Sequence, residues 1–122
     1  MMIKNAYITA TAHSVPEKIM TNHDLEKLVD TSDQWIQSRT GIKQRHVVNS
    51  DEATSDISTK IAIELLKKRN INPDEIDLII VGTVTPDHFT PSTAAIVQKN
   101  IKASNAWGYD LSAACSGFLF GL

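Results

Sequence analysis

The stretch from Asp77 to Thr85 constrains the fold more than any other part of the sequence. Its centre, Leu78-Ile79-Ile80-Val81, is continuously apolar and does not alternate with polar residues. Such a run is typical of a parallel strand that is buried on both faces of a sheet. Since two parallel strands need a crossover connection, we expect a helix and then a second strand beyond Thr85.

The next thirty residues contain candidates for both elements. Pro91-Ser92-Thr93 predicts the start of a helix that carries Ala94 to Ile101, and Ala106 to Leu111 predicts a strand. Upstream, residues 54–56 are capping types before a helix on which Ile57, Ile61 and Leu65 recur every four residues. The order of strands and helices predicts an α/β fold with a mostly parallel sheet and right-handed crossovers.

Other segments predict shorter elements. Residues 3–12 alternate loosely and predict a first strand, and 45–48 predict a short extended piece. Leu25, Leu28 and Val29 predict a helix after the capping types at 21–24, and a second short helix carries residues 35–39 and ends at Gly41. Lys67-Lys68-Arg69 places cations at the negative end of the long helix, although an acidic partner protein could also dock there.

Composition excludes several classes of function. Twelve Lys and Arg against fourteen Asp and Glu give a net charge of −2, which argues against nucleic-acid binding. A single cysteine forms neither an internal disulfide nor a cysteine-based zinc site, and we expect no metal. The N-terminus is not a signal peptide, and the longest aliphatic run is too short to cross a bilayer. These features predict a cytoplasmic protein with no membrane insertion.

That cysteine, Cys115, lies in Asp110-Leu-Ser-Ala-Ala-Cys-Ser-Gly-Phe118, between the predicted strand and an apolar segment that begins a helix. If Ser112 caps this helix, Cys115 lies in or near the first turn, where free N–H groups favour the nucleophilic thiolate. The plainer interpretation is that a lone cysteine is an inert core residue.

Two stretches of the chain carry a resemblance to a known family. The cysteine segment resembles the nucleophile segment of the thiolase-fold condensing enzymes, most closely that of β-ketoacyl-acyl-carrier-protein synthase III. Residues 30–46, Asp-Thr-Ser-Asp-Gln-Trp-Ile-Gln-Ser-Arg-Thr-Gly-Ile-Lys-Gln-Arg-His, are similar to the D-T-S-D-x-W-I-x-x-R-T-G-I-x-x-R signature of the same family. The resemblance implies the N-terminal half of a thiolase-like α/β fold, so residues 1–122 are expected to be a piece that stops just after the nucleophile.

The resemblance also implies an activity. Cys115 would accept an acyl group from acyl-coenzyme A, and malonyl-acyl carrier protein would then condense with it, with loss of carbon dioxide. The family uses coenzyme A thioesters as substrates without a separate cofactor, and its members are homodimers. The assisting His and Asn lie in H-Q-A-N and N-T-S stretches of the second half, which this chain does not contain.

Three further residues match positions that bind coenzyme A in the family. Trp35 offers a flat face for adenine, Arg39 a fork for phosphate, and Thr31 a lesser contact nearby. Without the resemblance, Trp35 would be taken for a core anchor and Arg39 for a partner in a surface ion pair. One position departs from the family: Thr90 stands before Pro91, where many members have a Phe that limits the acyl pocket. We therefore expect a primer preference broader than acetyl.

Two alternatives stay open at this point. A condensing enzyme of secondary metabolism with the same fold would have the same motifs. The 122-residue chain could also be a catalytically incomplete piece that only binds partner subunits or a carrier protein. A cysteine hydrolase is a more distant choice, since no protease signature surrounds Cys115.

Overall fold

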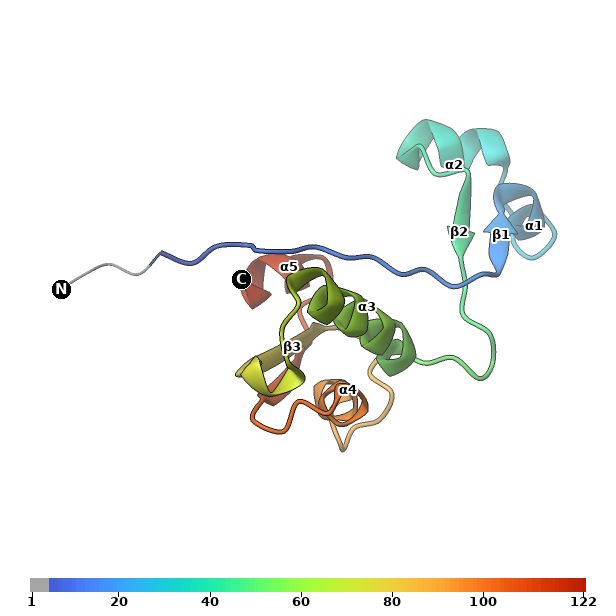
Figure 1. Ribbon diagram of the computed structural model, residues 1–122. Helices are drawn as coiled ribbons and strands as arrows, with labels where there is room; N and C mark the ends of the chain where they lie inside the picture. The colour runs from blue at the N-terminus through green and yellow to red at the C-terminus, as the bar shows by residue number, and fades with distance from the viewer. Residues whose placement is uncertain (1–4) are drawn as a thin grey trace. The chain divides into compact units, whose positions relative to one another are not determined.

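The computed structural model describes residues 5–122. These residues form two compact units, each with a two-stranded sheet of its own. The larger one, called the α/β unit, comprises residues 5–14 and 53–122, and the smaller one, called the small unit, comprises residues 15–52. Both are drawn in Figure 1.

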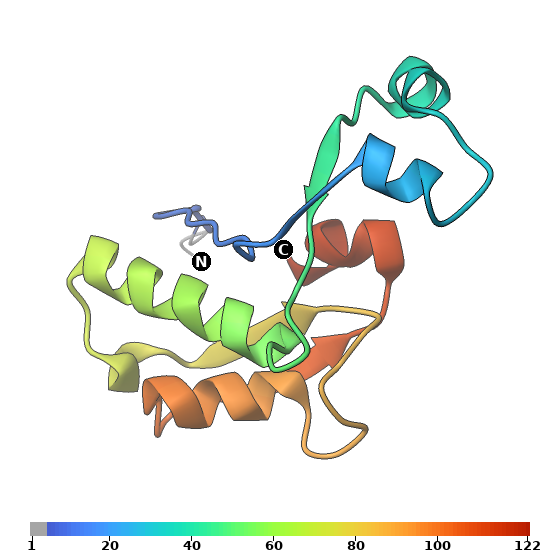
Figure 2. The same ribbon diagram turned by 90° about the vertical axis from the view of Figure 1, so that its right-hand side faces the viewer.

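The sheet of the α/β unit is parallel, as predicted. Strand β3 (Leu78–Gly82) pairs with β4 (Trp107–Leu111), with Ile80 opposite Tyr109. Helix α4 (Thr93–Ile101) makes the crossover and packs against both strands. The short helix α5 (Gly117–Gly121) lies on the other side of β3 from α4 (Figures 1 and 2). The strand–helix–strand prediction is therefore confirmed.

The core of this unit lies between the sheet and α4. Its buried members are all small or β-branched: Val81, Ala94, Val97, Ile101, Ala103 and Ala106. Helix α3 (Thr54–Arg69) packs along α4 and adds partly buried side chains to this cluster, among them Ala62 and Leu66. Burial of these apolar surfaces is the main stabilising term for the unit.

The N-cap of α3 lies one residue before the predicted capping residues and makes no side-chain hydrogen bond. The N-cap is Ala53, and its N–H donates to the Asp56 carboxylate at 2.9 Å. The last turn carries the three predicted cations, and Asn70 ends the helix in a left-handed conformation, with φ 51°. The helix is followed by the 3₁₀ segment η1 (Pro73–Glu75), capped by Asn72.

The predicted first strand is wrong over its described part. Residues 3 and 4 lie outside the described residues, and residues 5–12 form no strand. A strand needs a neighbour with which to exchange backbone hydrogen bonds, and β3 and β4 pair only with each other. The segment instead contacts α3 through Thr11, whose carbonyl accepts a hydrogen bond from Lys68 Nζ at 3.0 Å.

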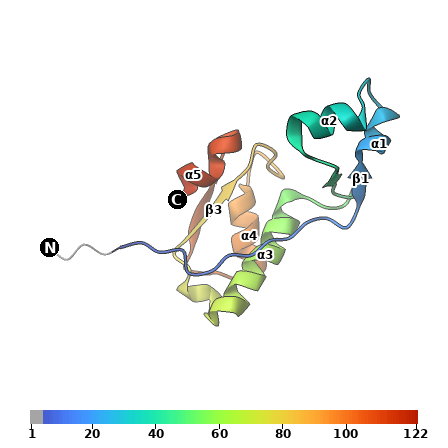
Figure 3. The ribbon, with the colours of Figure 1, turned by 90° about the horizontal axis from the view of Figure 1, so that it is seen from above.

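The prediction that β3 is buried on both faces is also wrong within this chain. Only Val81 of the strand is buried, and Leu78 is 39% exposed. A two-stranded sheet with one well-packed face leaves the other open. Residues of β3, α3 and α4 line a cavity of about 520 Å³, to which Thr9 and Ala10 also contribute. Figure 3 shows residues 5–14 passing close to α3.

The small unit is built on an antiparallel pair, β1 (Ile19–Thr21) and β2 (Gln44–His46), joined by helices α1 (Asn22–Glu26) and α2 (Asp33–Thr40). The sequence did not predict β1, which is three residues long. Helix α2 and its end at Gly41 were predicted correctly, with φ 71° at that glycine. Helix α1 ends before the predicted apolar face is complete, because Leu28 and Val29 are mostly exposed and give it nothing to bury.

Gly108 generates a prediction about the sheet. A Cβ atom at this position would lie 2.6 Å from the carbonyl oxygen of Ile79 on the neighbouring strand. Since that oxygen belongs to the backbone of the paired strand, we expect Gly108→Ala to lower the free energy of unfolding by at least about 2 kcal/mol. The measurement is denaturant unfolding followed by circular dichroism.

The matched control is Gly121→Ala. A Cβ atom there would meet only Ile80 Cγ2, at 3.8 Å, which is an ordinary contact. We expect this change to be neutral or slightly stabilising. Equal stability of the two variants would show that the β3–β4 approach does not require a glycine at 108.

Candidate active site

Two loops leave the same end of the parallel sheet. The first, residues 83–92, follows β3, and the second, residues 112–116, follows β4 and contains Cys115. They start side by side, because the Thr83 N–H donates to the Leu111 carbonyl at 3.2 Å. The carboxyl ends of parallel strands are the usual place for binding sites in α/β proteins. Both loops therefore begin at one edge of the sheet.

Cys115 lies at the centre of a tight turn. It is the middle residue of the 3₁₀ segment η2 (Ala114–Ser116), which the Ser116 N–H closes by donating to the Ala113 carbonyl at 2.9 Å. Ala114 has φ 44°, a left-handed conformation that costs a residue with a Cβ atom roughly 1 kcal/mol or more. Cys115 itself is exposed to solvent. An exposed thiol beside a strained residue does not fit the inert core cysteine of the plainer interpretation.

The predicted role of Ser112 is wrong. The N-cap of η2 is Ala113, the N-cap of α5 is Ser116, and neither makes a side-chain capping hydrogen bond. Cys115 precedes α5 and is not in its first turn. The 3₁₀ turn separates the strand from the helix by more residues than a direct strand-to-helix junction would need. The sequence pattern alone could not distinguish these two arrangements.

The first loop exposes its tip. Phe89 is fully exposed, and His88 and Thr90 are exposed beside it. Its base is fixed, because the Asp87 N–H donates to Thr93 Oγ1 at 3.2 Å and the Thr54 hydroxyl donates to the Thr85 carbonyl at 2.7 Å. The 520 Å³ cavity lies elsewhere in the α/β unit, since none of its lining residues belongs to either loop.

The predicted coenzyme A residues are in the small unit. Trp35 is 57% exposed, which contradicts a role as core anchor. The Arg39 guanidinium carbon lies 5.9 Å from the centre of the Trp35 ring, within the range of a cation–π contact. Arg39 forms no ion pair with any residue in 5–122. Thr31 is half-buried in the turn before Ser32, the N-cap of α2.

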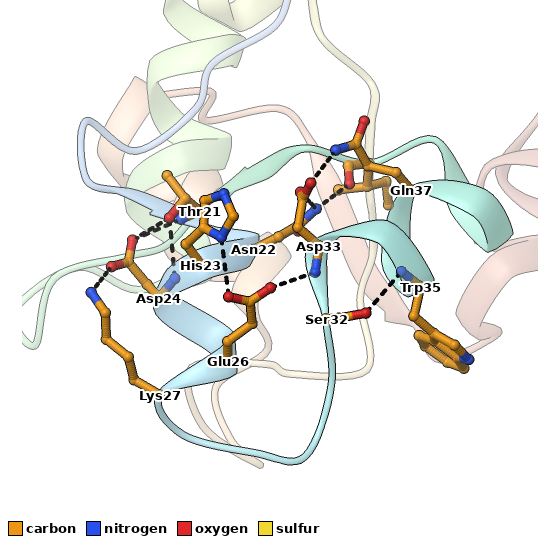
Figure 4. A network of polar contacts seen from close by, with 11 residues as sticks. Thr21, Asn22, His23, Asp24, Glu26, Lys27, Ser32, Asp33, Trp35 and Gln37 are labelled. Carbon is orange, nitrogen blue, oxygen red and sulfur yellow. Dashed lines mark hydrogen bonds and ion pairs between the residues drawn. The ribbon is translucent and has the colours of Figure 1, made fainter.

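A buried amide holds helix α2 in place. Asn22 is 1% exposed, and its Nδ2 donates to Asp33 Oδ1 at 2.9 Å and to the Ile42 carbonyl at 2.7 Å. Its Oδ1 accepts a hydrogen bond from Arg45 at 2.9 Å. The two carboxylate oxygens of Asp33 are both used, because Gln37 donates to the second at 2.6 Å. Figure 4 shows Asn22, Asp33 and Gln37 in contact around the N-terminus of α2, with Trp35 pointing away from them.

Charges at this helix end are arranged to favour ionised carboxylates. The hydrogen bond from Asn22 lowers the pKa of Asp33. Glu26 Oε1 accepts from the Asp33 N–H at 2.6 Å, and its other oxygen lies 3.1 Å from His23 Nδ1. This contact lowers the pKa of Glu26 and raises that of His23. Negative side chains at a helix N-terminus also interact favourably with the positive end of the helix dipole.

Several supporting residues were not identified from the sequence. Asp110, Asp87 and Asn22 bond to backbone groups of neighbouring segments, and no local pattern marks such contacts. Across residues 5–122, no cluster of three or more His, Cys, Asp or Glu side chains is placed to hold a metal ion. In the same range, no helix combines the length and apolar character needed to cross a membrane.

Comparison with known proteins gives one consistent result. The chain is 58% identical over 118 residues to β-ketoacyl-acyl-carrier-protein synthase III of Chlorobaculum tepidum, which covers 96% of the chain and 36% of that protein. It superimposes with a TM-score of 0.85 on the crystal structure of 3-oxoacyl-acyl-carrier-protein synthase III from Aquifex aeolicus, at 47% identity, covering 90% of the chain and 35% of that structure. No protein-family model matches.

A third comparison concerns a related activity. The priming β-ketosynthase of the R1128 polyketide pathway is 32% identical, with a TM-score of 0.83 over 88% of this chain and 32% of its own. The matches confirm the predicted resemblance and the thiolase-like α/β fold. The chain spans about a third of the length of the curated relatives it matches, 36% in the first two.

Asn22 generates a prediction about the small unit. Asn22→Ala removes three hydrogen bonds and leaves the Ile42 carbonyl and the Arg45 guanidinium without this partner. Because lost partners of buried polar groups are costly, we expect the free energy of unfolding to fall by about 2 to 4 kcal/mol. The measurement is denaturant unfolding followed by Trp35 fluorescence in a Trp107→Phe background.

Asn49→Ala is the control in the same unit. Asn49 is exposed, and its side chain makes only a long contact with Glu52, at 3.4 Å. We expect a change within about 0.5 kcal/mol. If Asn22→Ala proves as mild as this control, the Asn22 contacts do not hold α2.

Proposed function

Because this chain is homologous to the N-terminal third of β-ketoacyl-acyl-carrier-protein synthase III, we propose that it is the nucleophile-bearing portion of an initiating condensing enzyme. The enzyme would transfer an acyl group from acyl-coenzyme A to Cys115 and then to malonyl-acyl carrier protein. The observation that carries the proposal is an exposed cysteine in a tight turn at the carboxyl end of a parallel strand. The shared sequence covers both this segment and the predicted coenzyme A signature.

The proposed reaction has two stages. The Cys115 thiolate attacks the thioester carbonyl, coenzyme A leaves as its thiol, and the acyl group stays on sulfur. Malonyl-acyl carrier protein then loses carbon dioxide, and the carbanion that forms attacks the acyl-cysteine. The Cys115 thiolate leaves, and the product is a 3-oxoacyl-acyl carrier protein. The His and Asn that would stabilise the developing enolate are not in this chain, so we propose that residues 1–122 alone cannot complete the second stage.

Trp35 and Arg39 are the proposed nucleotide contacts. The exposed indole face can stack on adenine, and the guanidinium beside it can pair with a phosphate. Thr31, at the start of the same helix, is a proposed minor contact. Coenzyme A is a substrate in this proposal, and no separate cofactor is required. We further propose a cytoplasmic homodimer.

A polyketide-priming enzyme is the second candidate. The observation that favours it is the similarity to the R1128 priming β-ketosynthase, at 32% identity. The higher identity to the fatty-acid relatives favours the first candidate. The two differ in the primer and in the carrier protein that each accepts, so a competition between carrier proteins distinguishes them. A third possibility is that the chain acts only as a binding piece, and condensation activity of the complete protein would exclude it.

The first test measures condensation by the complete protein. With acetyl-coenzyme A and malonyl-acyl carrier protein, we expect a 3-oxoacyl-acyl carrier protein, and no product from Cys115→Ala. Trp35→Ala and Arg39→Ala should each raise KM for acyl-coenzyme A about tenfold with a smaller change in kcat, because they bind a part of the substrate that does not react.

Gln34→Ala provides the control, since Gln34 is exposed on the same helix between the N-cap and Trp35. Its KM should stay within twofold of the unchanged protein. Full activity of Cys115→Ala would contradict the proposed nucleophile. Unchanged KM values in the Trp35 and Arg39 variants would contradict the proposed coenzyme A contacts while leaving the nucleophile in place.

The loop after β3 generates a prediction about the primer. Thr90 is smaller than the Phe that many relatives carry before the proline, so the complete enzyme should use branched or longer acyl-coenzyme A primers. Thr90→Phe should shift the preference toward acetyl by about tenfold or more in kcat/KM. The measurement is kcat/KM over a series of chain lengths. Strict rejection of every primer beyond four carbons by the unchanged enzyme would contradict this prediction.

A further inference from the structure

Asp110 joins the strand that leads to Cys115 to the helix that packs on it. Its carboxylate accepts two backbone hydrogen bonds from the start of α4, from the Thr93 N–H at 2.7 Å and from the Ala94 N–H at 2.8 Å. The next N–H group of the helix, that of Ala95, donates to Ser92 Oγ at 3.2 Å. The first three N–H groups of α4 therefore have partners, and two of the three depend on a residue of β4.

The same contact continues into the first loop. Thr93, fully buried, accepts a hydrogen bond from the Asp87 N–H through its hydroxyl. The Asp87 carboxylate in turn accepts from the Ser55 N–H at the start of α3, at 3.0 Å. The two aspartates thus connect β4, the starts of two helices and the loop after β3 at one end of the sheet.

The Cys115 turn is held at both of its ends by this end of the sheet. Leu111, next to Asp110, is bonded to Thr83 at the end of β3. At the other end, Gly117 packs against Gly82, since a Cβ atom on Gly82 would make an ordinary van der Waals contact with the Gly117 carbonyl carbon, at 3.5 Å. Between these anchors the chain turns through Ala114 in its left-handed conformation. Such a conformation persists only where the surrounding structure fixes the backbone.

We propose that Asp110 is a positioning residue for Cys115. It fixes the end of β4 against α4 and so keeps the turn of residues 112–116 in the strained geometry that presents the thiol. The consequence for acyl transfer rests on the proposed function, whereas the consequence for the turn does not. Asp110 acts through the backbone and is not assigned any contact with the substrate.

The test compares Asp110→Asn with Ser92→Ala in the complete protein. The asparagine keeps one acceptor oxygen but replaces the other with an NH₂ group, which cannot accept from a helix N–H. Ser92→Ala removes a hydrogen bond from the same end of α4 without changing β4. Both variants lose part of the α4 cap, so a difference between them reports the connection to the strand.

Hydrogen exchange is the first readout, because it needs no activity. The amide of Ser116, which closes the turn, should exchange at least fivefold faster in Asp110→Asn and within twofold of the unchanged protein in Ser92→Ala. Peptides from the middle of α3 should keep their exchange rates in both variants, which separates a local effect from general destabilisation. If Asp110→Asn does not fold, Asp110→Glu, which displaces the carboxylate by one methylene group, takes its place with the same expected result.

Kinetics are the second readout. In Asp110→Asn, kcat should fall at least tenfold with KM for acyl-coenzyme A within twofold, because the thiol is displaced and the nucleotide contacts are not. Unchanged exchange at Ser116, or the same increase in Ser92→Ala, would overturn the positioning role. If the protein without substitutions transfers no acyl group, the proposed function is contradicted instead. The hydrogen-exchange result would still decide the role of Asp110.

Discussion

The parallel pairing of β3 with β4 determines where the candidate catalytic residues of the α/β unit lie. It brings the ends of both strands to one edge, so the loop with Phe89 and the turn with Cys115 start next to each other. The pairing depends on a close approach at Gly108, where the backbone oxygen of Ile79 leaves no room for a side chain. Helix α4 then covers one face of the pair and supplies most of its buried contacts.

Polar contacts fix the positions of helices that apolar packing alone leaves undetermined. Packing alone would tolerate small shifts of α4 along the sheet, whereas the two N–H groups that bond to Asp110 fix one position. In the small unit, Asn22 plays the same part for α2 and so determines where Trp35 and Arg39 are presented. Both residues are buried or half-buried and bond to segments distant in the sequence, and in both cases a single side chain joins several elements.

The sequence predicted the elements whose signals are local. Helix α3 follows from the four-residue spacing of Ile57, Ile61 and Leu65, and the end of α2 follows from Gly41, which adopts the left-handed conformation expected there. The Cys115 segment was identified by its resemblance to a family; the thiol is exposed, and its role as nucleophile stays a prediction. The features that could not be predicted depend on contacts between segments that are distant in the sequence. Residues 5–12 form no strand because no strand lies beside them, and the Cys115 turn is fixed by the contacts of Leu111 and Gly117.

The proposed acyl acceptor is the Cys115 thiol, in the turn that follows β4. The most direct measurement is peptide mapping by mass spectrometry after the complete protein is mixed with acetyl-coenzyme A and quenched in acid. We expect one acetyl group, carried by the peptide that contains Cys115 and removed by hydroxylamine as a thioester. A protein that stays unmodified under these conditions, or that carries the acetyl group on another residue, would contradict this expectation.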